Sequence, residues 1–130
     1  MTWRNSLRWL LAVFFVAAGA NHFLEPSFYA PMMPPWLPHP DGVIAFSGVA
    51  EILGGIAVLV PLARRAAGWG LIALLVAVFP ANLHMAVHHL SPPGMNFPAW
   101  VLWARLPLQA VFVIWAWWTA AEPPPENPLE

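Results

Sequence analysis

Hydrophobic residues along this chain form four long runs, at about residues 8–24, 42–61, 66–88 and 98–120. A helix needs roughly 20 apolar residues to cross the hydrocarbon core of a bilayer, and the last three runs meet that length. The first run is shorter. The pattern predicts an all-helical fold: a four-helix transmembrane bundle formed by residues 1–121.

The first run has a second interpretation. Ala-Gly-Ala at 18–20 follows a short apolar stretch and two arginines, and so resembles a signal-peptidase site. We favour a retained first span, because three spans would leave the polar residues described below short of partners. A soluble bundle is disfavoured, since a chain that is 60% hydrophobic and 8% charged cannot cover a globule with polar surface.

The connections between the runs differ in character. The first, EPSFYAPMMPPWLPHPD at 25–41, contains six prolines, which exclude a long regular helix. Its aromatic and methionine side chains favour a lid folded over the bundle, with Tyr29, Met33 and Trp36 as the lid residues. The tail at 122–130, EPPPENPLE, is acidic and proline-rich, and we predict that it is disordered.

Arginine placement predicts the orientation. Two arginines precede the first run and two stand at 64–65, whereas the connections 25–41 and 89–97 contain no Arg or Lys. The positive-inside rule then puts both termini in the cytoplasm. Tryptophans near the ends of the runs fit interfacial belts on both sides.

Charged residues inside the runs fall at one depth. Counted from the predicted outer surface, Glu51 lies about 13 Å deep and Arg105 about 11 Å deep. Because an unpaired charge in a bilayer is costly, we predict that these two side chains form a buried ion pair. Gly48 and Gly55 share a helix face with Glu51, and small residues mark helix contacts in membranes, so Glu51 is expected to point into the bundle.

The third run raises a question of helical phase. A stripe of small residues and histidines follows one face, namely Ala66, Gly70, Ala73, Ala77, Pro80, His84 and His88. This stripe predicts that His84 faces the bundle, beside Glu51 and Arg105. Asn82 falls almost opposite on an ideal helix, but Pro80 can kink the helix, so both Asn82 and His84 remain candidates for the interior.

The candidate ligand-binding residues are those polar side chains that fall in the outer half of the runs: Glu51, Arg105, His84, Asn82, His22 and Gln109. In the functional interpretation they orient a polar head group, such as a quinone carbonyl or a small acid. The alternative is a structural ion pair that fixes helix register. The spacing of His84 and His88 would allow both to bind one metal ion, but we assign no metal because a third ligand is missing. Haem bound between His22 and His84 is disfavoured too.

The amino-acid composition excludes several other kinds of site and partner. The chain has no cysteine, which excludes disulfides, thiolate metal sites and CxxC redox chemistry within it. Its net charge of −1 gives no basic patch for nucleic acid.

Three stretches resemble the DoxX-like family of small bacterial membrane proteins: GANHFLEPSFYAPMMPPWLP at 19–38, SGVAEILGGIAVLVP at 47–61 and GLIALLVAVFPANLHMA at 70–86. The resemblance implies a four-helix bundle in the bacterial cytoplasmic (inner) membrane. Some members are linked to quinone-coupled sulfur oxidation, as the membrane subunit of a thiosulfate:quinone oxidoreductase, and others to membrane oxidoreductase complexes or protein maturation.

Two function classes follow. The first is an accessory subunit of a quinone-linked membrane redox system, with quinone as the candidate ligand and a polar pocket in the outer half. The second is a structural or assembly partner of a membrane complex, or a homo-oligomer, without a ligand of its own. A small transporter ranks third because the inner half is almost wholly apolar. The sequence contains no self-contained catalytic motif, and we assign no enzymatic activity from it.

Overall fold

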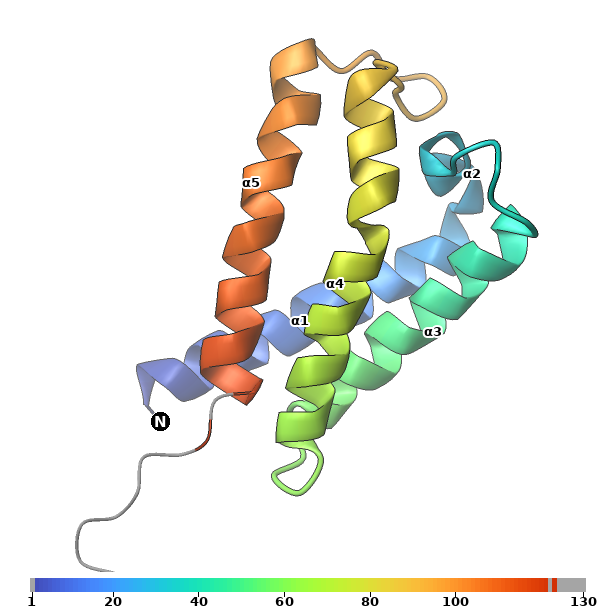
Figure 1. The fold of residues 1–130 in the computed structure, drawn as a ribbon. Coiled ribbons are helices and arrows are strands. Elements are labelled where there is room, and N and C mark those ends of the chain that lie inside the picture. Colours follow the sequence, from blue (N-terminus) through green and yellow to red (C-terminus); the bar gives the residue numbers. More distant parts are fainter. Residues whose placement is uncertain (1, 122, 124–130) are drawn as a thin grey trace, which may run out of the picture.

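The computed structural model describes residues 2–121 and 123, and these residues are helical without strands. Figure 1 shows the long helices, which are α1 (Trp3–Leu24), α3 (Pro40–Ala57), α4 (Arg64–Val87) and α5 (Ala99–Ala116). One turn of π-helix, η2 (Trp117–Ala121), continues α5, and the short elements α2 (Pro26–Tyr29) and η1 (Ala30–Met32) connect α1 to α3. The predicted disordered tail at 122–130 lies, apart from residue 123, outside the described residues.

Four helices, counting α5 and η2 as one, are long and apolar enough to cross a membrane. Large apolar side chains stand exposed on their outer faces, among them Val13, Leu53, Val76, Val111 and Ile114. Such a surface suits lipid as its solvent. The chain is therefore a multi-pass membrane protein, and the predicted four-helix transmembrane fold is confirmed.

The first helix begins earlier than its apolar run, at Trp3, and its 22 residues are sufficient for a span. Two arginines lie in the first turns of this helix, and their side chains contact backbone carbonyls of η2. Arg4 Nη2 donates to the Trp118 carbonyl at 2.7 Å, and Arg8 Nε donates to the Thr119 carbonyl at 2.7 Å. Carbonyls in a last helical turn lack helical partners, so arginine donors stabilise this end.

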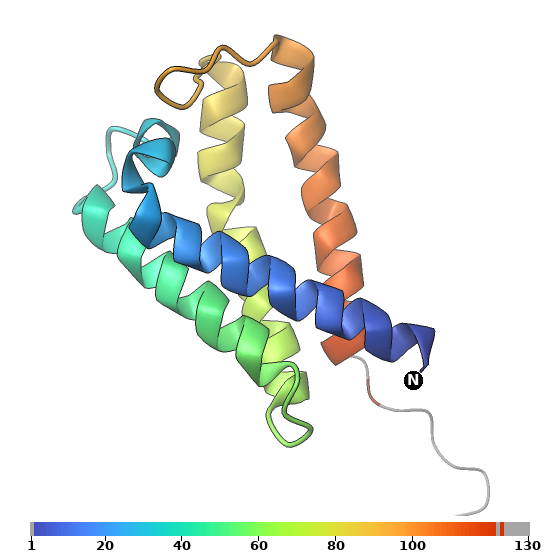
Figure 2. The same ribbon diagram turned by 180° about the vertical axis from the view of Figure 1, so that it is seen from behind.

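The long helices form two pairs. α1 packs along α3, and α4 packs along α5 (Figures 1 and 2). The first pair is close because glycines leave room for the backbones: a Cβ built at Gly19 would lie 2.6 Å from the Gly48 carbonyl oxygen. A Cβ at Gly55 would lie 3.0 Å from the Ala12 carbonyl oxygen. The predicted inward face of Gly48 and Gly55 is thus confirmed.

The two pairs join at the end of the bundle that contains the connection at 58–63, here called the turn end. Its apolar core unites side chains of α1, α4 and α5 with Val58, which directly follows α3: Leu11, Phe15, Val58, Leu71 and Ala116. Arg64 begins α4 but turns back to α3, where its Nε donates to the Val58 carbonyl at 2.8 Å. This contact supplies a donor to the carboxyl end of α3.

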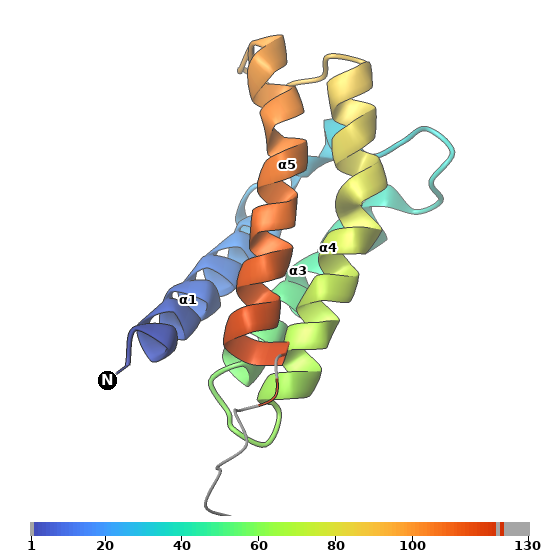
Figure 3. The same cartoon turned by 60° about the vertical axis from the view of Figure 1, so that its left-hand side comes forward.

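At the opposite end, the lid end, the two pairs diverge and residues 25–39 lie near the opening (Figures 1 and 3). Met32 anchors this segment, because its buried side chain packs with Met85 and Ala86 of α4 and with Leu102 of α5. Prolines limit the segment to short helical turns.

The inward face of α4 differs from the prediction. Most of the small-residue stripe is exposed, and a Cβ built at Gly70 would meet no atom within 4 Å. Leu71 is buried instead, against Gly54 of α3, where a Cβ would lie 2.6 Å from Leu71 Cδ2. The small residue at this contact comes from α3, and α4 contributes the large one, which is why the stripe on α4 does not mark its packed face.

Candidate functional site

A cavity of about 320 Å³ lies at the lid end, between the two helix pairs. Its apolar wall consists of side chains from α1, α4 and α5, chiefly Phe14, Phe15, Leu75, Val78, Leu108 and Phe112. Its polar side chains include His22, Ser47, Glu51, Asn82, Arg105 and Gln109, and the Tyr29 hydroxyl comes from the lid. Five of the six predicted ligand-binding residues therefore line one cavity, as do the predicted lid residues Tyr29, Met33 and Trp36.

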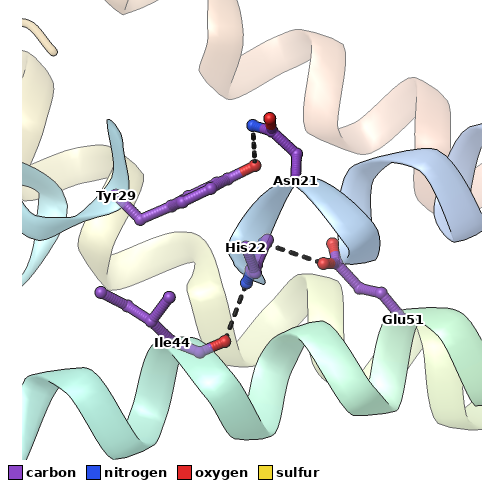
Figure 4. A network of polar contacts seen from close by, with 5 residues as sticks. All are labelled: Asn21, His22, Tyr29, Ile44 and Glu51. Atoms are coloured by element: carbon purple, nitrogen blue, oxygen red, sulfur yellow. Dashed lines mark hydrogen bonds and ion pairs between the residues drawn. The ribbon is translucent and has the colours of Figure 1, made fainter. Parts of the chain in front are cut away.

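His22 and Glu51 link α1 to α3 (Figure 4). His22 Nε2 lies 2.9 Å from Glu51 Oε2, and His22 Nδ1 lies 2.9 Å from the Ile44 carbonyl oxygen. A carbonyl oxygen can only accept, so Nδ1 must carry a proton. A short contact between Nε2 and Oε2 then needs one further proton, located on either atom. Whichever atom holds it, the pair as a unit is neutral.

Tyr29 extends this cluster from the lid. Its ring centroid lies 4.0 Å from that of His22, and its hydroxyl accepts a hydrogen bond of 2.8 Å from Asn21 Nδ2. The hydroxyl proton has no acceptor among residues 2–121, and Tyr29 lines the cavity. Burial raises the pKa of the Tyr29 phenol, although the amide of Asn21 opposes the shift. The group is therefore a neutral donor at physiological pH.

Asn82 and Gln109 form the polar link of the other pair. Asn82 Nδ2 donates to Gln109 Oε1 at 2.6 Å, and Gln109 Nε2 donates to the Leu75 carbonyl oxygen. Pro80 lies inside α4 and has no N–H to donate to the carbonyl four residues before it, in the turn that also contains the Leu75 carbonyl. One N–H of the Asn82 amide remains for a ligand.

His84 does not line the cavity, contrary to the prediction. Its ring packs against that of His88, with centroids 4.3 Å apart, and its carbonyl oxygen lies 3.0 Å from His88 Nδ1. Asn82 lies about three helical turns beyond the buried Leu71 and shares its face. The packed face of α4 thus continues through Pro80 to Asn82, and His84 lies off it.

The predicted ion pair between Glu51 and Arg105 is also wrong. Glu51 contacts His22, whereas Arg105 Nη1 donates to the thioether sulfur of Met85 at 3.1 Å. The reason is helix order: α3 packs against α1 and α4, and its backbone makes no close approach to that of α5. Matching depth brings both residues to one cavity without bringing them into contact.

Met85 was not among the predicted site residues. Its place beside Arg105 follows from its position one turn after Asn82, since residues three apart share a helix face. The spacing of Asn82 and Met85 can be seen in the sequence, but it predicts an inward Met85 only once Asn82 is known to face inward.

Metal binding has no clear site in the described part of the chain, where no three side chains of His, Asp or Glu are grouped to hold an ion. Both ring nitrogens of His22 are engaged by Glu51 and the Ile44 carbonyl, which leaves none for haem iron.

Comparison with known families shows a match over most of the chain. The model of the family described as "Domain of unknown function (DUF8561)" matches residues 11–120. The chain belongs to the DUF8561 family. The matched range of this DUF8561 protein contains every residue that lines the cavity. No curated protein and no solved structure matches the chain significantly.

Proposed function

We propose that this DUF8561 protein binds a quinone in the cavity at its lid end and serves a membrane redox system as an accessory subunit. The cavity carries the proposal, because it joins an aromatic wall to hydrogen-bond donors within membrane-spanning helices. Its volume of about 320 Å³ falls at the lower end of the range typical of small-molecule sites, roughly 300–1,000 Å³.

Quinones suit the cavity chemically. A quinone ring is flat and apolar, which fits walls that contain Phe14 and Phe112. Its carbonyl oxygens accept hydrogen bonds, and the Tyr29 hydroxyl and the second Asn82 N–H are donors without a protein acceptor in the described chain. Such convergent polar groups in an apolar site orient a ligand. Electrons would come from a partner subunit.

Localisation and orientation are part of the proposal. The arginine bias favours cytoplasmic termini, so the lid end would face the outer side of a bacterial inner membrane. The resemblance of residues 19–38, 47–61 and 70–86 to DoxX-like proteins adds support for a quinone-linked role.

The test is purification of the full chain from its native membrane in mild detergent, followed by extraction and mass spectrometry of bound lipids and quinones. We expect a quinone in the wild type at a substantial fraction of one per chain, and its loss in a Phe112→Ala, Asn82→Ala double variant. Gly70→Ala, which alters a site without neighbours, is the matched control. Preparations that retain native lipids but no quinone, together with no binding of added quinone, would refute the proposal.

A second candidate function is that of a structural partner. One observation favours it: the polar links fall within helix pairs, His22 with Glu51 between α1 and α3 and Asn82 with Gln109 between α4 and α5. Such links hold a bundle together without any ligand. In that case the same purification would yield a stable partner protein, and no quinone.

A further inference from the structure

Arg105 is a guanidinium on the wall of the cavity with one weak polar partner. Nη1 donates to the sulfur of Met85 at 3.1 Å, and a thioether is a weak acceptor. Nε and Nη2 carry further N–H donors, for which the described residues offer no acceptor. No carboxylate between residues 2 and 121 lies within ion-pair distance of this side chain.

The other ionisable groups of the cavity do not balance this charge. Glu51 shares one proton with His22, and because His22 Nδ1 is held as a donor by the Ile44 carbonyl, the pair is neutral in either protonation state. Tyr29 is a neutral phenol that lines the cavity from the lid. The remaining polar groups, which include the Ser47 hydroxyl and the mutually bonded amides of Asn82 and Gln109, are uncharged. The cavity therefore has one net positive charge.

We infer that the ligand of this cavity is a monoanionic amphiphile: an apolar body that carries a single negative charge on oxygen, bound by Arg105. The inference rests on the proposed quinone-binding function and narrows the quinone to an acidic one, such as a hydroxyquinone enolate. A fatty carboxylate shares the required chemistry and serves as a probe of it. Both place two oxygens in a plane, which matches the paired donors of a guanidinium.

The apolar wall of the cavity requires that the ligand also have a hydrophobic body. An anion alone gains little from Phe14, Phe15 and Phe112, whereas a hydrophobic body removes their surface from water or lipid contact. Inorganic anions are accordingly expected to bind weakly.

A matched pair of ligands tests the inference. Lapachol is a hydroxynaphthoquinone with a prenyl chain and is an anion at neutral pH, while its methyl ether has almost the same shape and no charge. Binding of each is measured by quenching of tryptophan fluorescence in the full chain, in one detergent, for wild type and Arg105→Gln. The ratio of the two dissociation constants is compared between proteins, so that partition into micelles cancels.

We expect wild type to favour lapachol over its ether by on the order of tenfold more than Arg105→Gln does, because a charge-assisted bidentate contact is lost. Arg65→Gln, a change at an exposed arginine away from the cavity, should keep the wild-type ratio. Equal ratios in wild type and Arg105→Gln, with both ligands bound, would overturn the inference and leave the proposed quinone site intact. Failure of wild type to bind either ligand would overturn both the inference of an anionic ligand and the proposed quinone site.

A second measurement needs no variant. Decanoate should displace lapachol from wild type, and decanol at the same concentration should displace far less. Equal displacement by decanoate and decanol would contradict a requirement for negative charge.

Discussion

His22 Nε2 and Glu51 Oε2 lie 2.9 Å apart across the interface of α1 and α3, and this contact replaces the expected pairing of Glu51 with Arg105. Because His22 Nδ1 donates to the Ile44 carbonyl, the contact contains one proton and is neutral as a unit. Its loss should therefore cost a buried hydrogen bond and leave no isolated charge.

The first prediction tests whether Glu51 contributes a hydrogen bond or a charge. Glu51→Ala leaves His22 Nε2 without a partner and should lower the free energy of unfolding by about 1–3 kcal/mol. Glu51→Gln offers Nε2 an amide donor and should cost less than about 1 kcal/mol. Equilibrium unfolding in mixed detergent micelles measures both. A loss as large for Glu51→Gln as for Glu51→Ala would show that the contact depends on a carboxylate charge.

A double-mutant cycle checks the choice of partner. His22→Ala and Glu51→Ala together should cost less than the sum of the single losses, since they remove one shared contact. The cycle of Glu51→Ala with Arg105→Gln should come much closer to additivity. Strong coupling between Glu51 and Arg105, with none between Glu51 and His22, would indicate that Arg105 is the partner of Glu51.

The second prediction concerns glycines. A Cβ at Gly48 would lie 2.8 Å from His22 Cβ and 3.0 Å from the Gly19 carbonyl oxygen. Gly48→Ala should therefore push α1 and α3 apart and cost about 1–3 kcal/mol of stability. Gly70→Ala meets no neighbour and should leave stability unchanged or raise it by up to about 1 kcal/mol, through better helix propensity. Equal effects of the two changes would argue against the close packing of α1 on α3.

The third prediction compares two neighbours on α4. Asn82 lines the cavity and His84 does not. Asn82→Ala should weaken binding of a quinone by about threefold to tenfold, the value of one hydrogen bond, while His84→Ala leaves it unchanged. Fluorescence quenching measures both. Loss of binding in His84→Ala alone would show that His84, and not Asn82, contacts the ligand.

The fourth prediction uses the only tyrosine of the chain. Burial raises the pKa of Tyr29, so absorbance of the phenolate should appear at a pH above the ordinary value of about 10. Asn21→Ala should raise the pKa further, because the Asn21 amide stabilises the phenolate. The unfolded phenol ionises first, so this contribution to stability is complete below pH about 10 and is lost as pH rises through the folded pKa. Titration at the ordinary value in both proteins would contradict the half-buried position of Tyr29.

The fifth prediction is topological. Reporter fusions at residue 130 should be active only with a cytoplasmic reporter, and fusions near residue 93 only with one that requires export. Export of the reporter at residue 130 would overturn the orientation and place the cavity on the cytoplasmic side.

The sequence by itself determined the four spans, the position of the polar residues in one half of them, and the inward face of Gly48 and Gly55. These features depend on local properties: length of an apolar run, distance along a helix, and spacing on one face. They needed no knowledge of which helices are neighbours. The proline-rich lid followed in the same way from its composition.

Only the tertiary structure decided which polar groups touch. Glu51 reached His22 because α3 lies along α1, and Arg105 stayed apart because α5 lies across the cavity from that pair. Asn82 rather than His84 entered the cavity because the packed face of α4 is set by Leu71 against Gly54, and not by the small residues of α4 itself. Helix order and the choice between two complementary surfaces arise from packing over the whole bundle, and no local spacing encodes them.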